Sequence, residues 1–358
     1  MKNVKMATGL VLIDAPASAL NNAGIEPGRM AENKVIVKKI RKGREEYPYV
    51  SGQAFKRWWR GTIQQKHAWT PSPINREAKV AYTEGNPIKY EEDDIFGYMV
   101  APARGEERGL VYRRVAPLKC TPLISLFSNV ITDDFAVFAR GPAEAEPVPY
   151  EQEFYSTTLK GAFSLMLTEI GVFHQGLSRD IPSAGDVKEA KVKEAKAKEF
   201  EQRVNSMLNE ATNKGALIDL QNASITLPAN ERKQRIKETL SSLSDLSGGA
   251  KAASYLTDVS PKFVITAIVS CANHIFMDII GTKDGKPILD TNVLEEIAKD
   301  YKDNFLSPIF IGLRKGFFDE QEYNKVFQTK ELNGTKVEFG TPKEAISELV
   351  KHVDKISL

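Results

Sequence analysis

The sequence has few of the residues that metal sites, disulfide frameworks and acid–base catalysis require. Its 358 residues include 2 cysteines and 4 histidines. Cys120 and Cys271 lie far apart, without a CxxC spacing or a neighbouring histidine, which argues against a zinc site and against a disulfide scaffold. The histidines form no recognisable acid–base pair along the chain. We therefore expect no metal, no cofactor and no catalytic residue.

Long apolar runs and a large excess of one charge are also missing. No segment approaches membrane-spanning length, and the first residues do not form a charged-then-apolar leader, so we expect a cytoplasmic protein with no membrane partner. The 49 lysines and arginines nearly balance the 47 aspartates and glutamates, which leaves a net charge of +2. A polyanionic partner must therefore be argued from local clustering of charge.

Such clustering is present between residues 34 and 66. Ten basic residues face two acidic ones, Glu45 and Glu46, so the local excess is eight positive charges. The basic residues are Lys34, Lys38, Lys39, Arg41, Lys42, Arg44, Lys56, Arg57, Arg60 and Lys66.

The segment 51–66 within this cluster has the pattern of an amphipathic helix. At 100° per residue, one face carries Gln53, Lys56, Arg57, Arg60 and Gln64, and the other Ala54, Phe55, Trp58, Trp59, Thr62 and Ile63. Ser51 stands where an N-cap would. Free backbone N–H groups, the helix dipole and side-chain cations would together attract a phosphate. An ordinary helix with a solvated cationic face explains this segment equally well.

Other patterns indicate an α+β protein. We expect strands at residues 7–13, 34–41, 154–167 and 261–271, a loop at 14–24 and a turn at 43–48. Residues 118–130 and 135–140 resemble a hairpin or an extended arm, and the acidic run at 91–94 resembles a solvated turn or a helix start. The glycine-rich loop 247–254 carries Lys251 but lacks the Walker spacing, although its backbone could approach a phosphate.

Six segments together resemble the DevR-type backbone subunit of the CRISPR Cascade complex. They are TGLVLID (8–14), ALNN (19–22), YVSGQAFKRWWR (49–60), FYSTTLKG (154–161), GGAK (248–251) and VSPK (259–262). The resemblance implies a modified RNA-recognition (ferredoxin-like) palm with fingers, a thumb hairpin and helical insertions. On that pattern the palm comprises residues 1–66 and 153–275 with a helical insertion at 171–246, the fingers 67–110, the thumb 111–152, and a C-terminal packing segment 276–358.

The same resemblance implies a non-catalytic subunit of a type I effector that polymerises along CRISPR RNA and presents the guide to target DNA. Its partners would be the CRISPR RNA, copies of itself in a helical filament, and the large, small and RNA-end-capping Cascade subunits. The residues that match the family's RNA-binding positions are Asn21, Asn22, Lys34, Lys38, Ser51, Gln53, Lys56, Arg57, Arg60, Gly249 and Lys251. A protein that holds any guide sequence should contact phosphate and sugar and leave the base edges free.

Two other functions are open. Backbone subunits of related complexes can cut target RNA with an aspartate after the first strand, and Asp14 occupies a comparable place. A single carboxylate without a basic partner is also what a plain turn contains. A transcription regulator or structural protein with an incidental basic helix is the second alternative.

Overall fold

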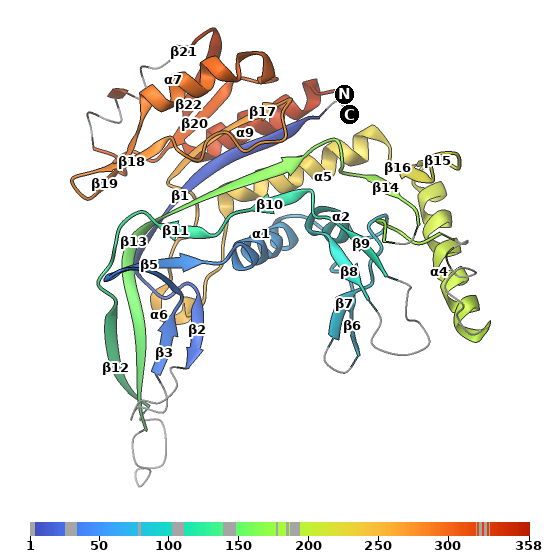
Figure 1. Cartoon of the computed structure of the whole chain (residues 1–358), viewed down its shortest axis with the longest axis horizontal. Coiled ribbons are helices and arrows are strands. Elements are labelled where there is room, and N and C mark those ends of the chain that lie inside the picture. Colours follow the sequence, from blue (N-terminus) through green and yellow to red (C-terminus); the bar gives the residue numbers. More distant parts are fainter. Residues whose placement is uncertain are drawn as a thin grey trace.

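The computed structural model describes residues 4–25, 34–77, 80–101, 111–138, 148–176, 178–183, 186, 194–319, 321, 324–325, 328 and 330–358. A mixed sheet of 13 strands forms its centre, in the order β21-β22-β20-β17-β1-β13-β11-β5-β4, with β10, β12, β3 and β2 attached beside this path (Figure 1). The α+β prediction is therefore confirmed. None of the described helices is long and apolar enough to cross a membrane.

Three long strands make the middle of the sheet. β1 (Met6–Ser18) pairs antiparallel with β13 (Val148–Met166) on one side and with β17 (Phe263–Val269) on the other. Every residue of β17 is buried, as a continuous apolar run predicts for a strand covered on both faces. The predictions of strands around 7–13, 154–167 and 261–271 are confirmed.

Shorter strands extend the sheet in both directions. Beyond β17 lie β20 (Ile309–Leu313), β22 (Thr335–Gly340) and β21 (Glu331–Leu332). Beyond β13 lie β10 (Leu118–Cys120), β11 (Leu123–Ser125), β5 (Glu45–Val50) and β4 (Lys39–Lys42). The segment 276–358 therefore contributes strands to the main sheet as well as a packing layer.

A long hairpin projects from one end of the sheet. β12 (Thr132–Phe138) pairs with the first half of β13, and β3 (Lys34–Val37) and β2 (Asn22–Ile25) lie beside it (Figure 1). The sequence pairing of 118–130 with 135–140 was wrong, because β12 forms its ladder with 148–154. Residues 139–140 lie outside the described chain.

Other predictions near the N-terminus also need correction. β1 continues to Ser18 and β2 begins at Asn22, so only residues 19–21 of the expected loop lie outside strands. Residues 34–41 form two strands, β3 and β4, that break at Lys38. Residues 45–48 belong to strand β5 instead of a turn, and they pair with β4.

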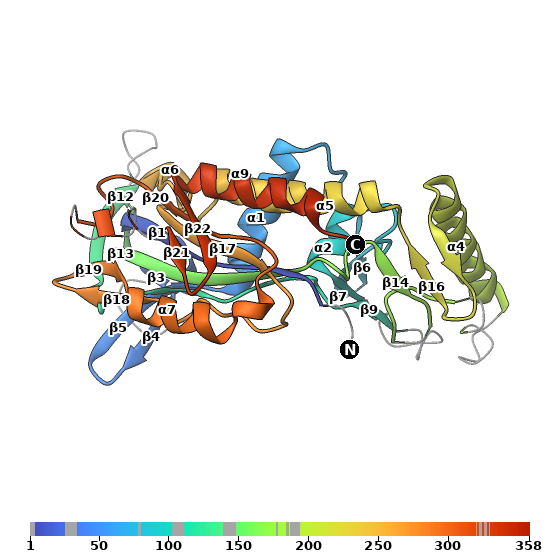
Figure 2. The same ribbon diagram turned by 90° about the horizontal axis from the view of Figure 1, so that it is seen from above.

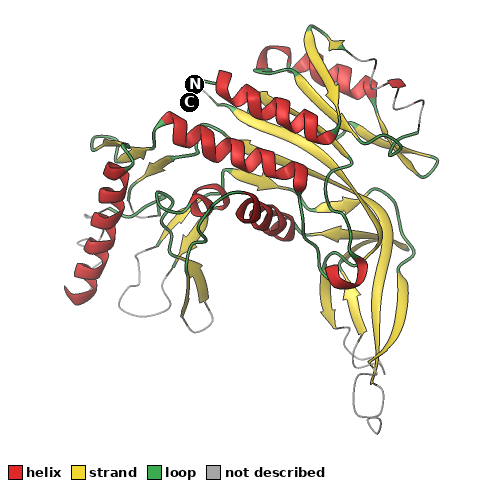
Figure 3. Cartoon of the chain, turned by 180° about the vertical axis from the view of Figure 1, so that it is seen from behind, coloured by secondary structure: helices red, strands yellow, loops and turns green. Residues whose placement is uncertain are grey.

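Helices cover both faces of the sheet. On one face α1 (Gly52–Lys66), α5 (Ala229–Ser242) and α9 (Pro342–His352) enclose a core that includes Trp59 and Phe163 (Figures 2 and 3). On the other face α7 (Thr291–Asp300) and the hairpin β18 (Ile280–Lys283)–β19 (Lys286–Leu289) enclose a second core with Leu10 and Leu12. A short helix, α6 (Ala252–Tyr255), follows the glycine-rich loop.

Small elements form a lobe at the end opposite the hairpin. They are β6 (Ile74–Glu77), β7 (Val80–Thr83), α2 (Glu91–Phe96), β8 (Tyr98–Val100), β9 (Tyr112–Arg114), β14 (Val172–His174), α4 (Glu194–Asn213), β15 (Leu217–Asp219) and β16 (Ser224–Thr226). In Figure 1 the lobe and the hairpin form the two sides of an arch, and α1 lies between them.

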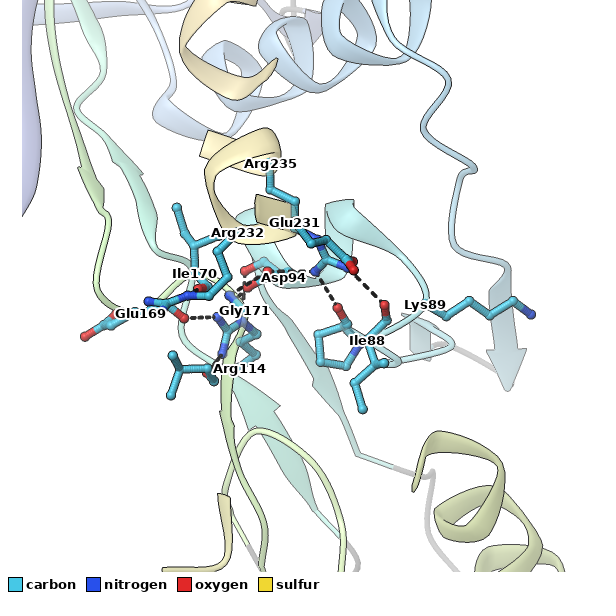
Figure 4. A network of polar contacts seen from close by, with 12 residues as sticks. Ile88, Lys89, Asp94, Arg114, Glu169, Ile170, Gly171, Glu231, Arg232 and Arg235 are labelled. Carbon is cyan, nitrogen blue, oxygen red and sulfur yellow. Dashed lines mark hydrogen bonds and ion pairs between the residues drawn. The ribbon is translucent and has the colours of Figure 1, made fainter. Parts of the chain in front are cut away.

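The acidic run at 91–94 fastens this lobe to the rest of the protein. It begins α2, which confirms the expected helix start, but Asp93 and Asp94 are buried, so the run is not solvated. The Asp94 carboxylate accepts hydrogen bonds from Arg114, from Arg235 at 2.8 Å and from the Gly171 N–H at 2.9 Å (Figure 4). One buried carboxylate thus joins α2, β9, α5 and the turn before β14.

Candidate nucleic-acid interface

Helix α1 is held rigidly against the sheet by its aromatic face. Trp59 packs edge-on against Phe163 of β13 with ring centroids 5.4 Å apart, and its indole N–H donates to the Thr239 carbonyl at 2.8 Å. Ser51 is the N-cap, and its hydroxyl accepts the Ala54 N–H at 3.3 Å. The helix and its cap are as the sequence predicts, and the C-terminal half of the opposite face is engaged, because Gln64 donates to Glu92 at 2.9 Å.

The N-terminal half of that opposite face carries two cations without ion-pair partners. Gln53 and Arg57 are exposed, Lys56 is half-buried, and neither Lys56 nor Arg57 pairs with a carboxylate in the described part of the chain. Burial raises the pKa of the nearby Cys120 thiol to about 12, and the charge of Lys56 opposes this shift. Both cations are therefore available to an external anion.

Arg60, one turn further on, is in a different environment. Its guanidinium lies 4.6 Å from the centre of the Phe96 ring, and its Nε is 3.7 Å from a carboxylate oxygen of Glu92. The side chain is 41% exposed, so the ion pair is partly solvated and one edge of the guanidinium stays accessible. We place Arg60 at the margin of the interface.

A hollow of about 350 Å³ lies beside Arg57, between α1 and the glycine-rich loop. Asn21 and Gly249 line it with Arg57 and Trp58, so three distant segments meet there. Gly248 and Gly249 have φ of +152° and +107°, and a Cβ on Gly248 would lie 2.5 Å from the Trp58 ring. Only glycine permits this close approach of backbone to the helix.

Two further contacts fix the rim of the hollow. The Asn21 side-chain oxygen accepts the Ser51 N–H at 3.0 Å, which joins the end of β1 to the start of α1. The Ala250 N–H donates to the Leu20 carbonyl at 3.0 Å. Lys251 follows directly, with an exposed side chain that has no ion pair among the described residues.

The remaining residues that the sequence singled out lie at the edge or inside. Lys38 is half-buried between β3 and β4, and the Asn22 side-chain oxygen is buried without a hydrogen-bond partner among the described residues. Lys34 is buried, with its ammonium 2.7 Å from Asp133 and 3.8 Å from Glu153. Because the charge of Lys34 is already balanced by these two carboxylates at the base of the hairpin, we leave Lys34 out of the interface.

Asp14 does not sit in a loop as the sequence suggested. It lies within β1 opposite Thr158. Partial burial raises the pKa of its carboxyl, and the charge of Lys262 opposes this shift. Within the described ranges, no group of three histidine, cysteine, aspartate or glutamate side chains could hold a metal ion.

Sequence reasoning missed the residues that shape the hollow. Leu20 and Trp58 look like plain core residues, yet they form its walls. The two glycines gave a signal, because paired glycines before a lysine indicate a backbone that must approach another group closely.

Chains of two solved structures have a fold similar to this one. The chain is similar to a chain of a "CRISPR RNA-guided surveillance complex", with a TM-score of 0.52 and 12% identity over 97% of this chain and 98% of that one. A chain of a "CRISPR RNA-guided surveillance complex, pre-nicking" matches with a TM-score of 0.53 and 10% identity, over 97% and 100%. At these identities the similarity defines the fold alone.

The family is established by the sequence itself. Residues 15–286 match the family described as CRISPR-associated negative auto-regulator DevR/Csa2, and this chain belongs to it. No curated protein sequence matches the chain.

Proposed function

We propose that this protein binds CRISPR RNA as a non-catalytic backbone subunit of a type I Cascade effector and presents the guide to target DNA. The observation that carries the proposal is the meeting of Arg57, Asn21 and Gly249 at one hollow, next to Lys56, which pairs with no carboxylate among the described residues. We call this surface the α1 interface. It comprises Asn21, Ser51, Gln53, Lys56, Arg57, Gly249 and Lys251, with Asn22, Lys38 and Arg60 at its margin.

The chemistry of this surface suits a sugar–phosphate chain. Its donors are two lysines, an arginine, amide groups and backbone N–H groups at a helix start, all of which bind phosphate oxygens. The aromatic side chains of α1 are buried under the helix, so stacking with bases is not offered there. A guide held in this way keeps its base edges free for pairing with any target.

The arch agrees with a hand-like division of the chain. In this proposal the main sheet with α1 is a palm of modified RNA-recognition type, the lobe at 67–110 belongs to the fingers, and the hairpin within 111–152 is the thumb. Family membership supports this assignment. Repeated subunits would align their α1 interfaces along one guide, which multiplies a modest affinity for each copy.

Binding should be insensitive to RNA sequence and sensitive to salt. Two single-stranded RNAs of equal length and unrelated sequence are expected to bind within about twofold of each other, because only phosphate and sugar are contacted. The logarithm of the affinity should fall linearly with the logarithm of salt concentration, by about 0.7 for each phosphate contact. Filter binding between about 50 and 500 mM salt measures both quantities.

The same assay separates the alternatives. Preference for one DNA operator over both RNAs would support the transcription regulator and contradict the proposal. Site-specific cleavage of bound target RNA with Mg²⁺, abolished by Asp14→Ala, would make the protein a nuclease. We expect intact RNA in both the parent protein and the variant.

The thumb hairpin should control assembly more than RNA affinity. Phe135 and Val137 project from one side of β12 and are 66% and 46% exposed. Apolar side chains displayed on a projecting hairpin suit a contact with another copy. The double change Phe135→Asp and Val137→Asp should reduce the number of copies on one long guide, as measured by mass photometry, while each copy binds a short RNA within about twofold of the parent affinity.

The matched control changes two other exposed apolar residues to aspartate. Leu217 and Leu220, near the β15–β16 turn, are 70% and 84% exposed. Particles of parental mass in the control and smaller particles in the hairpin variant are the expected pair of results. Equal masses in both would remove the hairpin from the assembly contact.

A further inference from the structure

A second, larger hollow of about 740 Å³ is lined by residues of β9, β10, the end of β13 and the segment around β14. Val4, just before β1, lines it, whereas the α1 interface begins at Asn21, beyond the end of that strand. The two hollows share no lining residue among those described, although Lys119 precedes Cys120, whose carbonyl lies beside Gly52 at the start of α1.

The second hollow also opens on the opposite face of the sheet. Leu118 and Cys120 of β10 pack into the core beneath α1, so strand alternation directs the side chain of Lys119, which lines the hollow, to the other face. Met166, another lining residue, packs against the core of that other face. Lys119 therefore projects from the sheet face opposite to the one that α1 covers.

Three cations of this hollow have no carboxylate partner. Arg113, Lys119 and Arg179 are exposed, and none of them forms an ion pair within the described ranges. Two acids line the same hollow. Asp180 lies 3.6 Å from the buried Arg114 and is neutralised by it, while Glu169 is exposed. The rim therefore has a surplus of positive charge, with Lys119, Arg113 and Arg179 against Glu169.

The two arginines are fixed relative to each other by backbone contacts. The Arg113 N–H donates to the Arg179 carbonyl at 2.9 Å, and the Ser178 N–H donates to the Val111 carbonyl at 2.9 Å. The Tyr98 hydroxyl donates to the carbonyl of Asp180. Arg113 comes from strand β9 and Arg179 from the turn after β14, so two distant segments are joined to present cations at one place.

We propose that this hollow binds the phosphate backbone of a second nucleic acid, distinct from the guide. An open polar hollow with separated, unpaired cations fits consecutive phosphates of a polyanion. Because Lys119 projects from the sheet face opposite to α1, the strand that occupies the α1 interface is not its expected ligand. The inference rests on the proposed function only in naming that strand as the guide. We name Arg113, Lys119 and Arg179 the second-strand site.

The test uses the full chain saturated with unlabelled guide RNA and a fluorescent DNA duplex that has no complementarity to the guide. The triple variant Arg113→Ala, Lys119→Ala and Arg179→Ala should bind the duplex about tenfold or more weakly at 0.1 M salt, with a flatter salt dependence. The matched control, Lys283→Ala, Lys286→Ala and Lys299→Ala, removes the same charge from three exposed lysines on β18–β19 and α7.

Guide binding by the same variants distinguishes the outcomes. We expect the triple variant to bind guide RNA within about twofold of the parent protein. Loss of guide binding in this variant would assign the hollow to the guide and overturn the inference. Equal duplex binding by the variant and the control would overturn it as well. Neither result depends on substitutions in the α1 interface, so a failure here is separate from a failure of the proposed function.

Discussion

Replacing Asp94 by asparagine is expected to lower the free energy of unfolding by about 3–5 kcal/mol. The carboxylate is fully buried and balances the charges of Arg114 and Arg235, which are themselves almost completely buried. Asparagine keeps the shape but removes the negative charge, and its amide would turn N–H donors toward a guanidinium or toward the Gly171 N–H. Among the described residues, Arg114 would then keep only Asp180 at 3.6 Å and Arg235 only Glu231 at 2.8 Å as counter-charges, and both of these carboxylates are less buried than Asp94.

A matched control comes from the same helix. Glu91 lies in the first turn of α2 and forms no ion pair with any described residue. Glu91→Gln removes the same charge and should cost less than about 1 kcal/mol, mostly through the helix dipole. Urea unfolding followed by circular dichroism measures both variants. Equal midpoints for the two variants would show that Asp94 does not hold the lobe in place.

The second large effect concerns guide binding. The triple variant Lys56→Ala, Arg57→Ala and Lys251→Ala should bind single-stranded RNA about a hundredfold more weakly at 0.1 M salt. Three lost phosphate contacts reduce the salt slope by about 2, which corresponds to two decades between 1 M and 0.1 M salt. The loss should be the same for every RNA sequence, because no base edge is contacted.

The surface control Lys283→Ala, Lys286→Ala and Lys299→Ala serves here too, since it removes three positive charges far from α1. We expect it to change the affinity by less than about twofold. Arg60→Ala should weaken RNA binding less than the triple variant does, because Arg60 is partly engaged by Phe96 and Glu92. Unchanged RNA affinity in the α1 variant, with an intact fold, would exclude the α1 interface as the guide site.

The elements with strong periodicity could be predicted from the sequence. Apolar residues at helical spacing and a serine cap define α1, and the alternation from Tyr155 onward defines the inner half of β13. The binding face follows from the same pattern, because the aromatic residues determine which side of the helix must be buried. The pattern predicts that Lys56 and Arg57 point outward, and in the structure Arg57 is exposed and Lys56 half-buried.

Pairings between distant residues could not be predicted. Lys34 and Asp94 are residue types that are usually exposed. Lys34 is buried because it pairs with Asp133 and Glu153, and Asp94 because it pairs with Arg114 and Arg235. A single sequence does not reveal such partners. The general expectation that a run of charged residues is solvated is therefore wrong where folding brings opposite charges together.

Short strands were missed for a related reason. β2 contains 4 residues, and β5 includes glutamates and a proline. Tertiary pairing stabilises these strands more than local propensity does. The same effect extended β1 past Asp14, because its ladder with β13 continues beyond the apolar run.

The length of β13 has a mechanical consequence. Its 19 residues form one uninterrupted strand that begins in the projecting hairpin and ends in the middle of the sheet. No loop separates the part of β13 in the hairpin from the part in the main sheet, so the sheet determines the direction in which the hairpin projects. Copies of the protein that contact one another through this hairpin would repeat with a constant pitch along the assembly. A continuous strand, instead of a hinge, would set that pitch.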